Sequence, residues 1–585
     1  MSIIYQAQNS NVMNKIIDRG KKLLTDPQDS VLSAASIIMV MIIASRVLGL
    51  VRQRVLAHFF TASELSLFFA AFRLPDLIFE ILVFGTFSSA FIPVFTRSLV
   101  KGEKKAWDIA STVVNLGMII FLILSLSLGL GADKFYAILA PGFASADQQK
   151  VADLARILFA AQGFFVVSYV LTAVLESLRR FFIPALAPLF YNLGIILGTL
   201  LLSSKLGLFA PVVGVVIGAS SHFLIQLPFA MKLGFRFKSK IKITDEVKRI
   251  GKLALPRLVE TSFLQLSKSA ELFFASLISI PSYTYYTFGN TLQLLPVGLF
   301  GTSIAKAALP TLTRQTENLL EFRKTILDAL YQMAFLILPV SAALIVLRVP
   351  IIRLIYGTGI FGWEATLQTG YVVSAFALGI IFQAGAAILA RGFYALHDTK
   401  TPVIISVTSI FITLVADYLL IRVIKTDIWG LALAFTIGSS FQAVTLFYFI
   451  NKKIDSFSLK LFLPFIKAFF AAFISGGFMY FILKFFDRSV WVKQLSFLGK
   501  LEIIQNLPFE SFVLDTRYTV NLIILTFFVL GSGTVIYLGL SLAFGSNEIW
   551  TFLGLLKRIF IRRKVTPIPK KETEPIAPTP GDTTP

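Results

Sequence analysis

The chain has 585 residues, of which 56% are hydrophobic and only 15% are charged, and its mean hydropathy is +0.79; this is too apolar for a soluble globular protein, in which roughly 25% of residues are charged. The formal net charge is +22, but the cations flank apolar runs as membrane anchors do, so we expect no nucleic-acid partner. The sequence has no Cys, three separated His and no HExxH or Walker-type loop, so we expect neither an enzyme nor a cofactor or metal site.

Long apolar runs recur along the chain and are the main structural signal. Runs of about 20 residues cross a bilayer as helices, because backbone in lipid must satisfy its own hydrogen bonds. The sequence therefore predicts an all-α polytopic membrane protein. After an N-terminal segment, 1–31, it predicts fourteen transmembrane helices, near residues 32–57, 65–95, 106–131, 152–178, 182–204, 208–231, 253–280, 283–312, 326–347, 367–394, 401–421, 428–450, 461–483 and 519–545.

The distribution of Lys and Arg between the loops predicts the orientation. Loops on the side of the N-terminus hold 22 of these cations and the opposite loops hold 12. Cytoplasmic loops carry the positive excess, so we expect both termini in the cytoplasm. Helices thirteen and fourteen, 461–545, enclose a long external loop, 484–518. The Pro- and Thr-rich stretch 565–585 is typical of a disordered tail, here cytoplasmic.

An internal repeat relates the two halves of the chain. The motif "IPVFTR", ending at Arg97, recurs 217 residues later as "LPTLTR", ending at Arg314, and matches in later loops keep nearly the same spacing. This pattern predicts a duplicated unit of six helices. Because six is even, the two copies have the same orientation, as in transporters that bind substrate between their halves. We expect an N-lobe over 32–231 and a C-lobe over 253–450.

Three arginines lie within the first two predicted helices. Arg46 is roughly 21 Å and Arg52 roughly 30 Å along a helix that starts at Leu32, and Arg73 precedes a kink expected at Pro75. An Arg at mid-bilayer costs about 2.5 to 3.5 kcal/mol, so such cations face a wet cavity or a partner. Guanidinium groups pair with phosphates through two parallel hydrogen bonds. We therefore expect an anionic, phosphorylated substrate, although Arg52 could also reach the outer interface.

The second half carries its own intramembrane charges. Lys268 and Lys306 are candidate substrate-binding cations, while Lys268 could instead neutralise Glu271 three residues later on the same helix face. Glu260 and Asp417 are candidate ligands for a coupling cation.

Several motifs together resemble one protein family. The segments "SRVLGLVRQRVLAHFF", "FFAAFRLPDLI", "FSSAFIPVFT", "APGFA", "RRFFIPALAPLFYN", "QLPF" and "LARGFYALHDTKTPV" resemble the MurJ (MviN) lipid II flippases of the multidrug/oligosaccharidyl-lipid/polysaccharide (MOP) exporter superfamily. The order and spacing match over about residues 40 to 450. Several motifs in the right order are more specific than a single short pattern.

The resemblance implies a fourteen-helix flippase in the bacterial cytoplasmic (inner) membrane. Such a protein moves the undecaprenyl-pyrophosphate-linked peptidoglycan precursor, lipid II, to the outer leaflet by alternating access of two lobes. Its last two helices form a groove for the prenyl tail. The family's first-helix arginines fall on Arg46 and Arg52, and its second-helix cation falls on Arg73. The implied partners are lipid II or a related polyprenyl-pyrophosphate glycan, membrane lipids and cell-wall synthesis enzymes.

The chain departs from the family pattern at several polar positions. Gln53 and Ser66 stand where the family has acids, and Glu80 falls in the place of a basic pair. The "DR" pair of helix 8 is also lost, with Thr291 in place of the arginine. Either a lysine of the C-lobe supplies the missing cation, or the substrate differs from ordinary lipid II.

Two other functions stay open on the sequence alone. The chain could export another polyprenyl-linked glycan, or it could be a non-transporting cell-wall scaffold that recruits enzymes through its long external loop. For transport, the energy would come from the membrane potential or an ion gradient, because no nucleotide site is visible.

Overall fold

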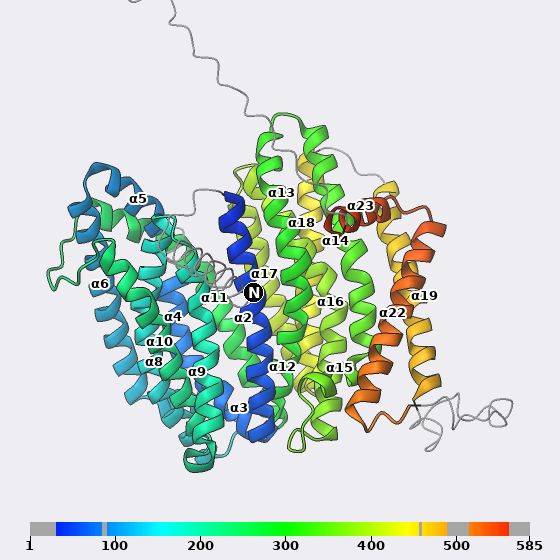
Figure 1. Ribbon diagram of the computed structural model, residues 1–585, viewed down its shortest axis with the longest axis horizontal. Helices are drawn as coiled ribbons and strands as arrows, with labels where there is room; N and C mark the ends of the chain where they lie inside the picture. The colour runs from blue at the N-terminus through cyan, green and yellow to red at the C-terminus, as the bar shows by residue number, and fades with distance from the viewer. Residues whose placement is uncertain (1–30, 85–89, 455–458, 488–513, 561–585) are drawn as a thin grey trace, which may run out of the picture.

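The computed structural model describes residues 31–84, 90–454, 459–487 and 514–560. In this part of the chain helices run side by side (Figure 1), and the one extended pairing is a single bridge between Asp487 and Leu514. The predicted all-α class is confirmed. The expected N-terminal segment up to residue 30, the expected tail 565–585 and most of the loop 484–518 lie outside the described residues.

The described helices follow the predicted order, and most extend a few residues beyond the predicted ends. The long ones are α2 (Val31–Phe59), α6 (Glu103–Leu130), α8 (Ser145–Ser177), α9 (Phe182–Leu206), α10 (Phe209–Lys232), α11 (Asp245–Ile278), α14 (Leu319–Val346), α16 (Trp363–Ala395), α17 (Lys400–Tyr418), α18 (Trp429–Ile454), α19 (Leu463–Phe486) and α22 (Thr519–Ala543). Shorter helices that the sequence reasoning missed are α5 (Ile92–Lys101), α7 (Ala132–Leu139), α15 (Arg348–Ile355) and α23 (Glu548–Phe560).

The outer surface of the bundle has the character of a lipid-facing surface. Within the described residues, eleven helices are long and apolar enough to cross a membrane. Most of the apolar stretch of α6 is exposed, and large apolar side chains such as Ile123 and Leu126 are more than half exposed. An exposed apolar surface of this extent marks a protein that sits in lipid. The chain is therefore a multi-pass membrane protein.

Two of the predicted helices are broken into segments that correspond to each other. The second consists of α3 (Ala62–Ala71), α4 (Arg73–Phe79) and the π-helix η1 (Glu80–Phe84); the eighth consists of α12 (Ser282–Pro296), the π-helix η3 (Val297–Gly301) and α13 (Thr302–Arg314). The two π-helices begin 217 residues apart, which is the offset of the sequence repeat. Widened π turns are frequent at functional sites.

The break in the second helix has a local cause. Pro75 has no N–H to donate to the carbonyl of Ala71, the residue four positions before it. The hydroxyl of Tyr136 donates to this carbonyl instead, at 2.8 Å. The discontinuity falls at Phe72, between α3 and α4, three residues before the expected kink.

The helices gather on either side of a central pair. In Figure 1, α5 to α10 lie on the left, α12 to α18 lie mainly on the right, and α2 and α11 lie between them. On the right, α16 packs against α12, α13, α14 and α18, and α19 packs against both α14 and α22. On the left, α10 packs against α8 and α9, and α9 also contacts α2.

Glycines allow α9 and α10 to approach each other closely. A Cβ atom added to Gly194 would lie 2.4 Å from the Cα of Gly218, and one added to Gly198 would lie 2.5 Å from the Cα of Gly214. Both contacts are with backbone, which cannot move aside as a flexible side chain can. Small residues four apart let membrane helices pack backbone to backbone.

We expect Gly198→Val to lower the thermal unfolding temperature of the detergent-purified protein by several degrees, because overpacking typically costs about 1 to 3 kcal/mol. Intrinsic fluorescence during heating measures this change. The matched control is Gly477→Val on α19, where an added Cβ meets no atom within 4 Å. An equal loss in both variants would contradict the close-packing argument.

Candidate functional site

A cavity of about 380 Å³ lies between α2 and the broken eighth helix. One wall of the cavity is formed by α2 and includes both arginines predicted in the first helix. The opposite wall is formed by α12, η3 and α13. Its lining residues are Arg46, Gly49, Leu50, Arg52, Gln53, Thr291, Leu294, Leu295, Val297, Gly298 and Thr302. The structure therefore brings Arg46 and Arg52 together at one cavity, between segments that are far apart in sequence.

Arg46 is held at the cavity by backbone alone. Its Nη1 donates to the carbonyl oxygen of Leu294 at 3.3 Å. Gly298 supplies the space for the guanidinium group, since a Cβ there would lie 2.5 Å from Nη2. Among the described residues Arg46 makes no ion pair, so its charge is available to an anion.

Arg52 lies against an aromatic ring. Its guanidinium carbon is 6.0 Å from the ring centroid of Tyr191, a distance at which cation–π attraction operates. Its Nε is buried and has no hydrogen-bond partner in the described part of the protein. Like Arg46, Arg52 has no carboxylate partner there.

Neutral hydrogen bonds replace charges beside the two arginines. Gln53 is 4% exposed; its Nε2 donates to Thr291 Oγ1 at 2.9 Å, and its Oε1 accepts from the hydroxyl of Tyr356 at 2.9 Å. Gln53 and Thr291 are two of the positions where the resemblance implies charged residues. These two departures therefore contact each other.

The two groups of helices also meet at the lower end of Figure 1, below the cavity. Ser66 and Thr284 share a hydrogen bond of 2.9 Å, and Thr284 Oγ1 donates to the carbonyl of Ala62 at 2.7 Å. The N–H of Gly142 donates to Ser276 Oγ at 3.3 Å, and a Cβ on Gly142 would lie 2.0 Å from the carbonyl oxygen of Ser276. These contacts join the two groups of helices at the lower end.

Arg73 lies outside the lining of this cavity. Its Nη2 is 3.4 Å from Asp76 Oδ2, and Asp76 Oδ1 also accepts from the side-chain amide of Gln162 at 2.6 Å. The Arg73 side chain is only 15% exposed. Arg73 is thus paired with an acid within its own short helix.

Lys268 is paired as well, but with a different acid from the one that sequence spacing suggested. Its Nζ donates to both carboxylate oxygens of Glu80, at 3.0 and 2.9 Å. The side-chain amide of Gln265 donates to the same carboxylate. The sequence indicated Glu271 as the neutralising partner, because helical spacing cannot show that η1 packs against α11.

The other candidates are separated. Lys306 is exposed on α13 and makes no ion pair within the described residues. Asp417 is 2% exposed at the end of α17, close enough to Glu271 to interact with it electrostatically. The side chain of Glu260 lies outside the described residues. No group of three or more His, Asp and Glu side chains is arranged to hold a metal ion in the described part of the chain.

Comparison with known proteins identifies the relatives of this chain. Residues 55–501 match the family described as "Lipid II flippase MurJ". The chain belongs to the MurJ family. A probable lipid II flippase MurJ of Vibrio cholerae serotype O1 is 31% identical over 391 residues, covering 64% of this chain and 74% of that protein. One from Haemophilus influenzae is 28% identical and covers 79% and 96%, respectively. The family resemblance indicated by the sequence motifs is confirmed.

Solved structures show the same fold. A lipid II flippase MurJ in an inward closed conformation is similar with a TM-score of 0.68 at 23% identity, covering 87% of this chain and 99% of that one. An inward-facing multidrug resistance transporter of the MATE family is similar with a TM-score of 0.57 at 15% identity, covering 70% and 94%. At these identities the two matches show a shared fold.

We expect Gly298→Val to impair lipid II transport almost as strongly as Arg46→Ala, because the new side chain occupies the place of the guanidinium group. Transport by purified protein in vesicles measures this effect. The control is Gly554→Val on α23, where an added Cβ has no neighbour within 4 Å. Transport by Gly298→Val at the rate of this control would contradict the assignment of the space beside Arg46.

Proposed function

We propose that this chain is a lipid II flippase, which moves the undecaprenyl-pyrophosphate-linked peptidoglycan precursor across the cytoplasmic membrane by alternating access. The observation that carries the proposal is the cavity where Arg46 and Arg52, both without a carboxylate partner among the described residues, face the broken eighth helix. Membership of the MurJ family and its many relatives named lipid II flippase support this function. Transport rather than catalysis follows from the same family.

The chemistry of the cavity suits a diphosphate. A guanidinium group donates two parallel hydrogen bonds to phosphate oxygens, and it keeps its charge at every physiological pH. In surroundings less polar than water, attraction between the cations and a diphosphate is stronger than at an open surface. Because Arg46 donates here to one backbone carbonyl, most of its donors remain available to a ligand.

We propose that two lobes, 32–231 and 253–450, form the moving parts, with helices thirteen and fourteen outside them to complete fourteen. The equal spacing of η1 and η3 supports the duplication, because each lobe has a π turn at the same point of its second helix. A cavity bounded by α2 from one lobe and α12 from the other is where alternating access would expose a substrate in turn to each side.

In the proposed orientation the upper end of Figure 1, where α2 begins and α23 lies, faces the cytoplasm. The excess of Lys and Arg in the upper loops supports this orientation. The hydrogen bonds at the lower end would then close the external side, so the described state is one that faces inward.

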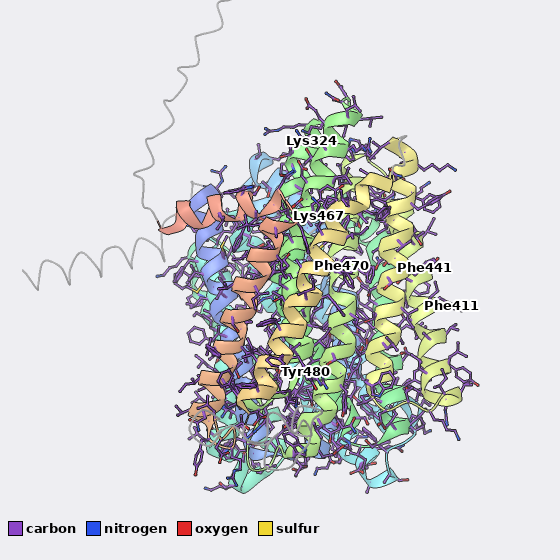
Figure 2. All side chains as sticks on the ribbon, turned by 90° about the vertical axis from the view of Figure 1, so that its right-hand side faces the viewer. Lys324, Phe411, Phe441, Lys467, Phe470 and Tyr480 are labelled. Carbon is purple, nitrogen blue, oxygen red and sulfur yellow. The ribbon has the colours of Figure 1, made fainter. Side chains whose placement is uncertain are left out.

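The prenyl tail of the substrate would lie against the last two helices. On α19 the aromatic side chains Phe469, Phe470 and Phe473 are each at least half exposed, and Figure 2 shows α19 beside α22 with Phe470 and Tyr480 along it. Such a surface is compatible with a long hydrocarbon chain in the bilayer. Gln53 and Thr291, which are neutral where the resemblance implies charged residues, favour one alternative substrate, a related polyprenyl-linked glycan.

We expect Arg46→Ala to abolish transport of labelled lipid II between the leaflets of reconstituted vesicles, because the diphosphate loses a paired donor. The assay compares the label accessible outside the vesicles before and after transport. Arg314→Ala is the matched control, since Arg314 is an exposed arginine at the upper end of α13. Binding of lipid II by the wild-type chain without transport would favour the scaffold alternative, and transport of another polyprenyl glycan alone would favour the exporter.

We propose that Asp417 contributes to binding a coupling cation, with Glu260 as a second candidate from the sequence. A carboxylate buried within a membrane helix is costly unless a cation or a proton compensates its charge, and the nearby Glu271 increases that cost.

We expect Asp417→Asn to remove the stimulation of lipid II transport by an imposed cation gradient, because the amide cannot compensate a cation. Separate Na⁺ and proton gradients across the vesicle membrane identify the ion. Glu364→Gln at the exposed start of α16 is the control for loss of a carboxylate. Full stimulation in Asp417→Asn would exclude this carboxylate from coupling.

A further inference from the structure

Glu80 is an acid in an unusual place. It is the first residue of η1 and directly follows α4, which carries Arg73 and Asp76, in the second predicted span. Its carboxylate is fully engaged, with two hydrogen bonds from Lys268 and one from Gln265. These partners lie on α11, the first helix of the other repeat, so the ion pair joins the two repeats inside the predicted membrane region.

This ion pair is accessible, in contrast to the neighbouring Arg73. The Lys268 side chain is 39% exposed and the Glu80 side chain 26% exposed, whereas Arg73 is 15% exposed. A charged pair exposed to acyl chains would be costly, so the exposed side of this pair faces the interior between the repeats. A ligand there can reach the ammonium group.

A row of aromatic rings connects the arginine cavity to this ion pair. Arg52 lies over Tyr191 at 6.0 Å; the ring of Tyr191 is 5.2 Å from that of Phe165, which is 6.2 Å from that of Tyr169. The ring of Tyr169 is 5.4 Å from that of Phe79, the residue before Glu80. A chain of ring contacts, in which Phe165 and Phe79 are buried, therefore links a cation without a carboxylate partner among the described residues to a cation held by a carboxylate.

We propose that Glu80 is an internal competitor that controls the access of the substrate diphosphate to Lys268. Without substrate, the carboxylate holds the ammonium and ties η1 to α11. A diphosphate, with more negative charge and more acceptor oxygens than a carboxylate, takes Lys268 from Glu80. This inference rests on the proposed flippase function and adds Glu80 to the residues that determine how the substrate is bound and released.

The competition would couple binding to movement. When the diphosphate takes Lys268, the contact between η1 and α11 is lost, which is required if the repeats are to move relative to each other. When Glu80 recovers Lys268, the diphosphate is displaced. Glu80 thus weakens binding and speeds release, two effects that a purely structural ion pair would not have.

Binding of farnesyl diphosphate to the full-length chain in detergent tests the competition. We expect Glu80→Gln to bind about ten-fold tighter, because the amide keeps the shape but no longer neutralises Lys268. Lys268→Met should bind more weakly than wild type. In the Lys268→Met background, Glu80→Gln should have little effect, because the group for which Glu80 competes is absent.

The matched control is Glu246→Gln. Glu246 lies on α11, the helix that carries Lys268, but at its upper end. It is ion-paired with Lys105 at 2.5 Å, and its side chain is about as exposed as that of Glu80. It should leave the affinity unchanged. Glu80→Asp, which keeps the charge on a shorter side chain, provides a second variant if Glu80→Gln does not fold; its affinity should fall between those of wild type and Glu80→Gln.

Transport of lipid II in vesicles gives the second measurement. Glu80→Gln should lower the lipid II concentration at half-maximal rate and lower the maximal rate, because release becomes slower. Unchanged or weaker farnesyl diphosphate binding in Glu80→Gln would overturn the proposal, and so would equal tightening in the Lys268→Met background, which would reveal a general effect of charge. If the wild-type chain neither binds the diphosphate nor transports lipid II, the proposed flippase function itself fails.

Discussion

The central constraint on this protein is the cost of placing guanidinium groups within a membrane. The usual solution, a carboxylate next to each arginine, would neutralise the charge that a diphosphate needs. Here Arg46 donates a hydrogen bond to a backbone carbonyl, and its guanidinium group occupies the space beside Gly298. Arg52 lies over the ring of Tyr191. Both contacts stabilise the cation and leave its charge intact. The end of α12 and the π turn η3 therefore belong to the proposed binding site, because they supply the carbonyl and the glycine.

The departures from the pattern that the motifs resemble lie beside this cavity. Gln53 and Thr291 stand where the resemblance implies an acid and an arginine, and the two neutral side chains share a hydrogen bond. Neither candidate lysine of the C-lobe lines the cavity. Lys268 is occupied by Glu80, and Lys306 lies exposed on α13.

Sequence reasoning predicted the all-α class, the membrane-spanning helices and the family. It also placed Arg46 and Arg52 at one cavity, together with Arg73, which lies outside the lining. These features depend on hydrophobicity, spacing and motifs, which are local properties of the chain. The pairing of Lys268 with Glu80 was missed because the two are 188 residues apart, and nothing in a helical pattern specifies which helices meet. The available signal was an acid, Glu80, in the second predicted span at a place where the resemblance implies basic residues. The roles of Gly298 and Tyr191 were also missed, because a glycine matters here only through the side chain that fills its space.

The contacts at the lower end have a consequence in the proposed orientation. The hydrogen bonds described there join serine and threonine side chains and backbone groups, none of which titrates near neutral pH or attracts counterions. In that orientation they face the surroundings of the cell, where salinity and acidity vary, and their strength would change little through such variation.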